Sequence, residues 1–564
     1  MKRHFVIAFL LAVAALAYGN TLVNSFTLDD KLYIELNPQV TDVSLRGLFA
    51  ANKIADVFRP VTFATLALNW EIGGRRPFGY HLFNLLLHGA ATLLLYFLLE
   101  AIFLESSEEK PSARDKLVAF AAALIFAVHP IHTEAVSSIV GRAEILAAGF
   151  IFAAWILHLK DRPFAALICF VLALLSKESA VVFLPLILAG DYARTKWKPR
   201  ISYALTAGTT LLYLAVLWKA QGGHLGRASI NPLDNPLASL PAGWRVLNAL
   251  RVAWMYVALH FYPAKLSCDY SFNAIPVSRD WRHTLPALFA ALAVAAAWTA
   301  AIWKRKSALT VAGAISLIGF ATTANILLPT GTIMGERLAY LPSAGLCLLG
   351  ALAWSWLRDR QKLVALAALT AVVAGFAMRT ALRNRDWHDN LSLFEAAVRA
   401  APGSAKMHSG LGAEYLDEGR IDLAGPQLEA ALHIEPNYPD AMESYGLLQS
   451  TIGNYRAAGA LMERALNMSN RENPNYDFMA VNFAAVLMQT GHQDAALDVL
   501  NREISESPRY ARAWANRAVL HYQQGETAPA RSDAESALRL DPGNSQAHNL
   551  MVLLDGSAEA VTSK

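Results

Sequence analysis

Two adjacent carboxylates, Asp29 and Asp30, follow the first apolar segment of a chain built mostly from apolar segments of membrane length. Neighbouring carboxylates raise each other's pKa, so one can remain a base while the other orients or shares a proton. The alternative is structural: the pair lies in a loop and caps a helix that begins near Lys31. The sequence by itself leaves both alternatives open, and acid–base chemistry is the hypothesis that its surroundings must support.

Two groups of polar residues lie at the ends of apolar segments. His81, Asn84 and His88 recur at intervals of three and four residues and therefore share one helix face. They line a substrate cavity or form a polar seam between helices. Lys177 and Glu178 separate two short apolar blocks and are expected at or near the outer interface, where charges need a partner or water. They form an internal ion pair, or Lys177 is available to a phosphate.

A third group lies in the connection that contains His129, His132 and Glu134. These residue types bind metals, but a complete set of ligands is not evident. The sequence therefore does not indicate a metal, although a divalent ion remains compatible with it.

Three arginines in segments expected on the same side are candidates to contact an anion. They are Arg142, Arg59 and Arg337, the last of which follows Glu336. An acid pair that faces cations at a membrane surface suits a substrate whose anionic phosphate is anchored by lipid.

Composition and charge define the broad class of the protein. Of the 564 residues, 55% are hydrophobic and 17% are charged, and the hydrophobic residues come in blocks. This profile is typical of a membrane protein with many spans followed by a soluble part. The net charge of +4 is small for this length and does not favour a nucleic-acid partner. The three cysteines form no CxxC pair, so neither a disulfide framework nor a zinc cluster is predicted.

The first apolar run covers residues 5–18 and follows Lys2 and Arg3. It is a membrane anchor or a signal peptide. The signal peptide is an alternative because the run is short and ends in residues that resemble a cleavage site. In both cases the basic start remains inside, and residues 21–79 form an external segment.

Eleven further apolar blocks follow, and several are shorter than the roughly 20 residues of a straight span. They occupy residues 80–104, 117–131, 145–159, 164–175, 180–190, 201–218, 246–262, 285–303, 308–328, 338–356 and 363–378. The basic connections, expected in the cytoplasm, contain Lys110, Arg114, Lys116, Lys160, Arg162, Arg194, Lys196, Lys198, Arg200, Lys304, Arg305, Lys306, Arg358, Arg360 and Lys362.

These connections all face the cytoplasm only if one block does not cross. Residues 246–262, which contain Arg251 and His260, suit an interfacial or re-entrant helix. The prediction is thus about eleven spans, with the N-terminus inside and residues after 378 outside. Arg379, Arg383 and Arg385 argue against this orientation, because it places these basic residues on the outer side.

From residue 405 the sequence repeats with a period of about 34 residues, the length of the helix–turn–helix tetratricopeptide unit. The predicted array covers residues 405–554, with units at 405–438, 439–472, 477–510 and 511–544, an insertion at Asn473-Pro474, a preceding half repeat within the connector 379–404, and a tail at 555–564. Small residues let the paired helices approach, glycine permits the turn and proline stops the second helix. Such an array binds extended polypeptides or serves as a spacer.

In their order, these motifs resemble the transmembrane and tetratricopeptide repeat-containing O-mannosyltransferases, which have the GT-C membrane glycosyltransferase fold. The resemblance runs nearly end to end and rests on Asp29-Asp30 with Asn37-Pro38, on Arg59-Pro60, on residues 80–88, 129–134, 141–144, 176–178 and 336–342, and on the repeats. Two features depart from the family: the array is shorter than in animal members, and Leu28 rather than an aromatic residue precedes the pair. The short array favours a microbial member.

The resemblance implies transfer of a hexose, expected to be mannose, from a polyprenyl-phosphate donor to Ser or Thr hydroxyls of proteins. One of Asp29 and Asp30 would be the general base of an inverting displacement, and Asp29 is preferred because Asp30 adjoins Lys31. The candidates for the donor phosphate are Lys177, Arg142, Arg337 and His81. The cavity would be supported by Arg59, Asn84, His88, His129, His132, Glu134, Glu178 and Glu336.

The predicted architecture is therefore all-α, with a GT-C membrane domain over residues 1–378 followed by an α-solenoid that holds the acceptor polypeptide. The repeats are expected on the outer, periplasmic or lumenal side of the plasma, inner or endoplasmic reticulum membrane. A non-catalytic membrane scaffold that uses only its repeats is the alternative. A flippase or transporter would need a polar path across the bilayer, whereas the ionisable groups cluster towards one face.

Overall fold

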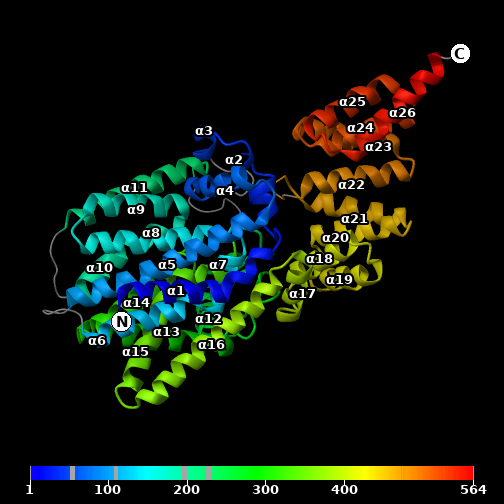
Figure 1. Cartoon of the computed structure of the whole chain (residues 1–564). Helices are drawn as coiled ribbons and strands as arrows, with labels where there is room; N and C mark the ends of the chain where they lie inside the picture. Colours follow the sequence, from blue (N-terminus) through cyan, green and yellow to red (C-terminus); the bar gives the residue numbers. More distant parts are fainter. Residues whose placement is uncertain are drawn as a thin grey trace. The chain divides into compact units, whose positions relative to one another are not determined.

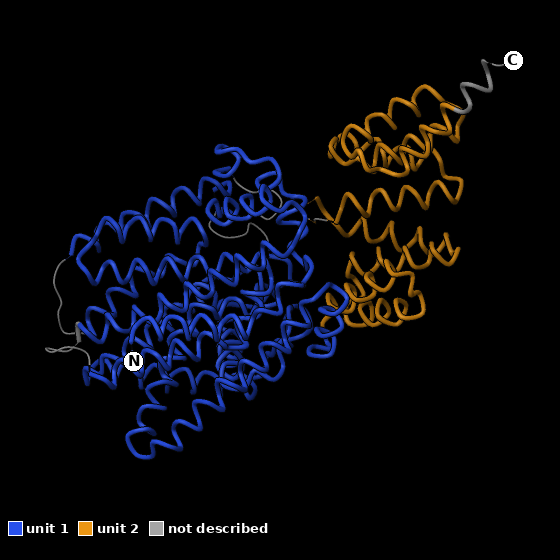
Figure 2. The backbone as a smooth tube through the Cα atoms, in the orientation of Figure 1, with its two compact units in different colours: residues 1–403 blue, residues 404–564 orange. Residues whose placement is uncertain are grey.

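The computed structural model describes residues 2–50, 57–106, 112–193, 200–223, 230–471, 473 and 475–562. Three lysines of the predicted basic connections, Lys110, Lys196 and Lys198, lie outside these residues, as do Arg194 and Pro474. The chain divides into two compact units, residues 1–403 and residues 404–564, which Figure 2 distinguishes by colour.

The described residues form helices and no strand, which confirms the all-α prediction (Figure 1). The α-helices of the first unit are α1 (Arg3–Tyr18), α2 (Pro38–Thr41), α3 (Leu45–Leu48), α4 (Pro60–Gly73), α5 (Pro77–Ser106), α6 (Ala113–Ala127), α7 (Thr133–Ser137), α8 (Arg142–Leu159), α9 (Pro163–Ser176), α10 (Phe183–Ala193), α11 (Ile201–Ala220), α12 (Ala242–Phe261), α13 (Trp281–Trp303), α14 (Ser307–Phe320), α15 (Tyr340–Arg358), α16 (Lys362–Asp386) and α17 (Asn390–Ala400). Short helical turns η1 (Gly19–Val23), η2 (Lys31–Glu35), η3 (Pro130–His132), η4 (Glu178–Val182), η5 (Pro236–Ser239) and η6 (Glu336–Ala339) connect them.

Among the described helices, seven are long and apolar enough to cross a membrane, or eight if the bent pair of residues 113–127 and 130–137 counts as one span. The expected eleven spans exceed this number. The physical reason is length: α9 and α14 have 14 residues each and α10 has 11, fewer than a straight crossing needs. The helix α12, expected not to cross, is absent from the seven and exposes Trp254 and Phe261, aromatic residues that suit a membrane interface.

One apolar core joins α1, α5, α6, α8 and α15. In it α5 packs on α6 and α8, and α15 packs on α6. The first helix buries Val6, Leu10 and Ala14 in this core, and the Tyr18 hydroxyl donates to the His129 carbonyl at 2.8 Å. The helix α1 is therefore part of the core of the first unit.

The second unit consists of paired antiparallel helices followed by a terminal helix. They are α18 (Ala405–Asp417), α19 (Ile421–Ile434), α20 (Pro439–Thr451), α21 (Tyr455–Met468), α22 (Tyr476–Gln489), α23 (Gln493–Glu506), α24 (Ala511–Gln523), α25 (Thr527–Leu540) and α26 (Ser545–Thr562). Gly453, between α20 and α21, has a φ of +83°, which only glycine adopts without strain. A Cβ atom at Gly412 would lie 2.6 Å from Leu428 Cγ, so glycine there allows α18 and α19 to approach.

Candidate functional site

The structure separates the two members of the acid pair. Asp29 is exposed, whereas Asp30 is fully buried. Asp30 Oδ2 accepts from the Thr27 backbone N–H at 3.0 Å, and Asp30 Oδ1 accepts from the Val140 N–H at 3.1 Å. Asp30 directly precedes η2, but its side chain makes no capping hydrogen bond to that helix. The two carboxylates therefore differ in role. Asp30 connects its loop to the segment before α8 through the hydrogen bond from Val140, whereas the Asp29 side chain is exposed at the surface.

Burial raises the pKa of Asp30 to about 7, although the hydrogen bonds from Thr27 and Val140 act in the opposite direction and the neighbouring Asp29 charge adds to the rise. Desolvation disfavours the charged form of a carboxyl group, and two backbone donors offset only part of that penalty. Asp30 thus holds its proton to near-neutral pH.

The turn that presents the pair is held by residues from the other end of the first unit. Leu28 has a φ of +49°, a conformation that is strained for a residue with a side chain. Its N–H donates to Asn390 Oδ1 at 2.9 Å, and the Ser25 N–H donates to the His388 carbonyl at 2.8 Å. Strained backbone persists where the surroundings fix it and is frequent at functional sites.

The guanidinium group of Arg337 lies close enough to this turn for the charge of Asp29 to act on it. Arg337 Nη1 donates to Glu134 Oε1 at 2.7 Å, and the Arg337 backbone N–H donates to Glu134 Oε2 at 2.9 Å. The Glu134 side chain is 2% exposed and that of Arg337 is 33% exposed. Glu134 thus fixes the guanidinium from one side while part of it stays accessible.

Two further ion pairs adjoin this arrangement. Lys177 Nζ is paired with Glu144 in a buried contact. Burial lowers the pKa of Lys177, while the Glu144 charge acts against this shift. Arg59 binds Glu178 through two hydrogen bonds, Nε to Oε2 at 3.0 Å and Nη2 to Oε1 at 2.7 Å. Burial alone would lower the pKa of Arg59, but the Glu178 carboxylate raises it overall.

These pairs form one electrostatic cluster. The charge of Glu144 acts on Arg59 and on Arg337, and the charge of Arg337 acts on Lys177. We call Asp29, Arg59, Glu134, Glu144, Lys177, Glu178 and Arg337 the ion-pair cluster. A group of oppositely charged side chains fixed by mutual pairing is pre-organised to stabilise charge that develops on a substrate.

Arg142 and Asn84, in contrast, link helices inside the fold. Arg142 is fully buried, and it donates through Nε to Asn84 Oδ1 at 2.8 Å, through Nη1 to the Thr65 carbonyl at 3.0 Å and through Nη2 to the Tyr80 carbonyl at 3.1 Å. Its three nitrogens all have partners. His81 is also fully buried.

The remaining predicted histidines pack together in the core. His88 Nδ1 contacts the Tyr340 hydroxyl at 2.7 Å, and His132 Nε2 contacts Ser343 Oγ at 2.7 Å. The ring of His129 stacks on that of His260, with centroids 4.2 Å apart. In the described parts of the chain, no group of three or more His, Cys, Asp or Glu side chains is placed to hold a metal ion.

Glu336 lies in a separate buried environment. Its Oε1 accepts from the Ser267 N–H and from the Tyr270 hydroxyl, both at 2.7 Å. Arg383 lies near enough to act on it electrostatically and is buried, with Nε and Nη2 unpaired among the described residues.

Sequence reasoning missed the roles of Glu144 and Arg383. Glu144 is the partner of Lys177, and only the fold brings these residues, 33 positions apart, into contact. In the sequence, Arg383 is notable only as a positive charge on the outer side, where the predicted orientation does not favour basic residues. The burial of Arg383 near Glu336 cannot be predicted from the sequence, because it depends on which segments pack around the end of α16 in the fold.

Comparison with known proteins supports the resemblance. The tetratricopeptide repeat family model matches residues 377–440, 410–477 and 482–545. Protein O-mannosyl-transferase F38B6.6 of Caenorhabditis elegans is 30% identical over 451 residues, which cover 76% of this chain and 62% of that protein. Protein O-mannosyl-transferase TMTC3 of Mus musculus is 26% identical over 609 residues, which cover 97% of this chain and 65% of that protein. The chain thus spans less than two thirds of the length of these relatives.

Among solved structures, the crystal structure of YrrB, a tetratricopeptide repeat protein with an unusual peptide-binding site, is 18% identical and covers 35% of this chain and 96% of that one, with a TM-score of 0.24. A likeness at this level does not bear on function. The expectation of a microbial member is unsupported, since the relatives named above are animal proteins. The chain is a homologue of the protein O-mannosyl-transferases with tetratricopeptide repeats, as its motifs predicted.

Proposed function

We propose that the chain is a multi-pass membrane glycosyltransferase of the GT-C type. It transfers mannose from a polyprenyl-phosphate donor to Ser or Thr hydroxyls of polypeptides on the outer or lumenal face. The names of its relatives motivate the reaction class. The observation that carries the assignment is the separation of the acid pair, with an exposed Asp29 beside the cations of the ion-pair cluster and a buried, hydrogen-bonded Asp30.

In this mechanism Asp29 is the general base. It takes the proton of the acceptor hydroxyl as the hydroxyl oxygen attacks the anomeric carbon of the sugar. The bond from that carbon to the phosphate oxygen breaks, the phosphate leaves with the electron pair, and the proton passes from Asp29 to water. A single displacement inverts the anomeric configuration, as in inverting glycosidases. Asp30 acts as a positioning residue, because its bonds to Thr27 and Val140 hold the turn that presents Asp29.

The leaving phosphate is placed at Arg337, with Arg59 and Lys177 as the neighbouring cations. Arg337 is the member of this set whose side chain is one-third exposed while one edge is fixed by Glu134. A guanidinium held in this way can offer its remaining donors to a phosphate. Arg142 and His81 are less suited to contact the donor, because both are fully buried and Arg142 already has three partners.

The repeats of residues 404–564 are proposed to hold the acceptor polypeptide. Stacked helical repeats form extended surfaces that bind polypeptides. Tethering an acceptor to the enzyme raises the effective concentration of its hydroxyl groups at the site.

The test is transfer by the purified full chain in liposomes, with polyprenyl-phosphate mannose and a Ser/Thr-containing peptide. Asp29→Asn is expected to lower the rate by about 10²- to 10⁴-fold, the usual contribution of a general base. Asp42→Asn, which changes another exposed aspartate of the same external segment, is the matched control and is expected to keep the wild-type rate. Equal rates for wild type and Asp29→Asn would overturn the assignment of the base. No mannosyl peptide with wild-type protein would overturn the proposed reaction and favour the scaffold.

The proposed side of the membrane has its own test. A protease added to sealed, outward-facing membranes is expected to degrade residues 404–564, and full protection of the repeats would contradict the orientation.

A further inference from the structure

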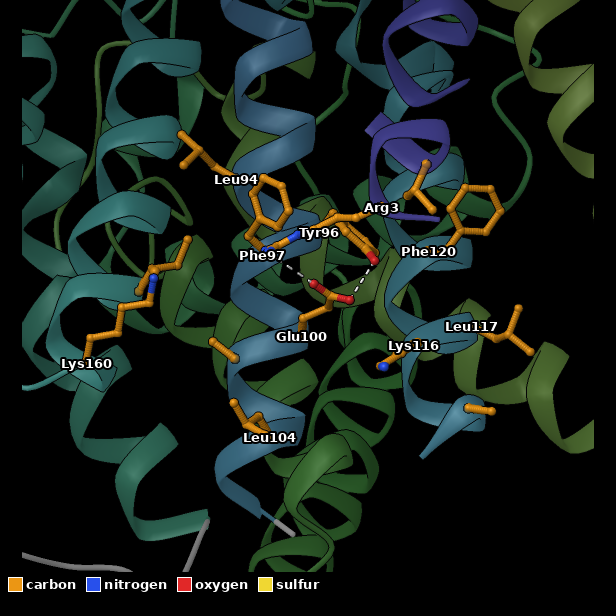
Figure 3. A pocket seen from close by; sticks show the side chains of 14 residues that line it. Arg3, Leu94, Tyr96, Phe97, Glu100, Leu104, Lys116, Leu117, Phe120 and Lys160 are labelled. Carbon is orange, nitrogen blue, oxygen red and sulfur yellow. Dashed lines mark hydrogen bonds and ion pairs between the residues drawn. The ribbon is translucent and has the colours of Figure 1, made fainter. Parts of the chain in front are cut away.

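A cavity, whose lining residues Figure 3 draws, lies between helices α1, α5, α6 and α8, and no residue of the ion-pair cluster lines it. Its volume is about 990 Å³. Ten of its fourteen lining residues are uncharged and mostly apolar, with Leu94, Phe97, Leu104 and Phe120 among them. The other four carry charge, three of them positive.

This cavity and the candidate site are at opposite ends of the same helices. On α5, Asn84 binds Arg142 near the candidate site, and Glu100 lines the cavity. Glu100 follows Asn84 by sixteen positions, which correspond to about 24 Å of helix, most of the roughly 30 Å hydrocarbon core of a bilayer. On α1, Arg3 lines the cavity, whereas Tyr18 contacts His129 at the other end.

One of the positive charges is already partly engaged. Arg3 Nη2 lies 3.8 Å from Glu100 Oε2, and the Arg3 guanidinium lies over the ring of Phe97, 4.6 Å from its centroid. The Tyr96 hydroxyl donates to Glu100 Oε1 at 2.6 Å, which fixes the carboxylate. Figure 3 shows the contacts of Glu100 with Arg3 and with Tyr96 as dashed lines.

The two lysines are different. Lys116 near the start of α6 and Lys160 after the end of α8 are both exposed, and the ammonium group of neither has a hydrogen-bond or ion-pair partner within the described part of the chain. With Arg3 and Glu100 included, the cavity carries a formal charge of +2. Two unpaired ammonium groups above an apolar wall are complementary to an anionic head group on a hydrocarbon chain.

We propose that this cavity binds an anionic glycerophospholipid of the leaflet opposite the candidate site. The phosphate lies between Lys116, Lys160 and Arg3, and an acyl chain follows the wall formed by Leu94, Phe97 and Leu104. A lipid accounts for both parts of the cavity, because a soluble phosphate would use the cations and leave the apolar wall without a partner. Basic cavities between membrane helices bind anionic lipids in this manner, and the cytoplasmic leaflet is rich in them.

The experiment is native mass spectrometry of the purified full chain in detergent, titrated with phosphatidylglycerol and, separately, with phosphatidylcholine. The wild type is expected to retain phosphatidylglycerol in preference to phosphatidylcholine. The double variant Lys116→Gln and Lys160→Gln is expected to bind phosphatidylglycerol about 25-fold more weakly, since each lysine near an anionic surface contributes about 1 kcal/mol and 1.4 kcal/mol is a factor of ten.

Two variants control for charge and for shape. Lys304→Gln with Lys306→Gln makes the same change of charge at two exposed lysines outside the cavity, and it is expected to bind as the wild type does. Ala101→Trp fills the cavity without changing its charge and is expected to weaken retention of both lipids.

Three results would overturn the proposal: equal retention of the two lipids by the wild type, an equal loss in the Lys304/Lys306 variant, or binding of inorganic phosphate alone as tightly as the lipid. If Ala101→Trp does not fold, the two lysine pairs still decide the outcome. The measurement requires no sugar transfer, so its failure leaves the proposed enzymatic activity unaffected.

Discussion

The two ends of the helices α1, α5, α6 and α8 use charged residues in opposite ways. At the end near Asp29, each cation of the ion-pair cluster has a carboxylate partner, as in Lys177 with Glu144. At the other end, Lys116 and Lys160 have no such partner among the described residues. Cations paired within the protein are fixed in position before a substrate arrives, whereas unpaired cations depend on an anion from outside. The first arrangement suits catalysis, and the second suits a bound lipid.

The largest effect is expected from breaking a buried pair in the cluster. Lys177→Met leaves the Glu144 carboxylate buried without a cation, and the loss should be about 3 to 5 kcal/mol of unfolding free energy. The double variant Glu144→Leu with Lys177→Met should regain most of it, because an apolar pair carries no desolvation penalty. Denaturant unfolding in detergent measures both. Equal destabilisation by the single and the double variant would contradict the pairing of Lys177 with Glu144.

A smaller effect is expected on transfer when the exposed cation of the cluster is lost. Arg337→Gln removes the proposed contact to the leaving phosphate and should lower the mannosyl transfer rate by about 10²- to 10³-fold, as for other lost donors at a developing charge. Arg305→Gln, at an exposed position between α13 and α14, is the control. A transfer rate that responds equally to both substitutions would remove Arg337 from the site.

The pH dependence of stability tests the buried acid. The pKa of Asp30 is raised to about 7 in the folded chain, so the folded chain holds a proton that the unfolded chain has already released. The contribution of Asp30 to the unfolding free energy should therefore fall by about 2 kcal/mol between pH 5 and pH 7. Asp30→Asn should abolish this part of the slope, and Asp42→Asn should preserve it. A slope that is identical in all three proteins would mean that Asp30 ionises as an exposed carboxylate does.

The smallest effect is expected at the opposite end. Replacing Lys116 and Lys160 by Gln should change the unfolding free energy of lipid-free protein by less than about 0.5 kcal/mol, because neither lysine supports an internal contact. The same denaturation measurement applies. A loss comparable to that of Lys177→Met would make the two ends alike and remove the contrast.

Much of the fold could be predicted because its signals are local. The 34-residue period and the apolar blocks depend on residues close in sequence. The structure has helices in the repeat region and in the apolar blocks. The number of spans stays a prediction, because α9, α10 and α14 are apolar but shorter than a straight crossing, and hydrophobicity alone does not tell a short packed helix from a tilted crossing one.

The candidate site was less predictable, because its geometry depends on distant residues. The spacing of His81, Asn84 and His88 correctly indicated one helix face, and all three are buried on α5. Nothing in the sequence shows that Asp30 is buried while Asp29 is exposed. One of the two backbone donors to Asp30 is Val140, which lies 110 positions away in the sequence.

The turn at Leu28 also has a consequence for the order of synthesis. It leaves the ribosome well before Asn390, which bonds to it and is made 362 residues later. At the usual 5 to 20 residues per second, about 20 to 70 seconds pass between the two. Throughout that interval the nascent chain carries its acid pair without the partner that fixes it. The proposed base therefore takes its final position only after Asn390 has been made, so a nascent chain that has not reached this residue presents no assembled site.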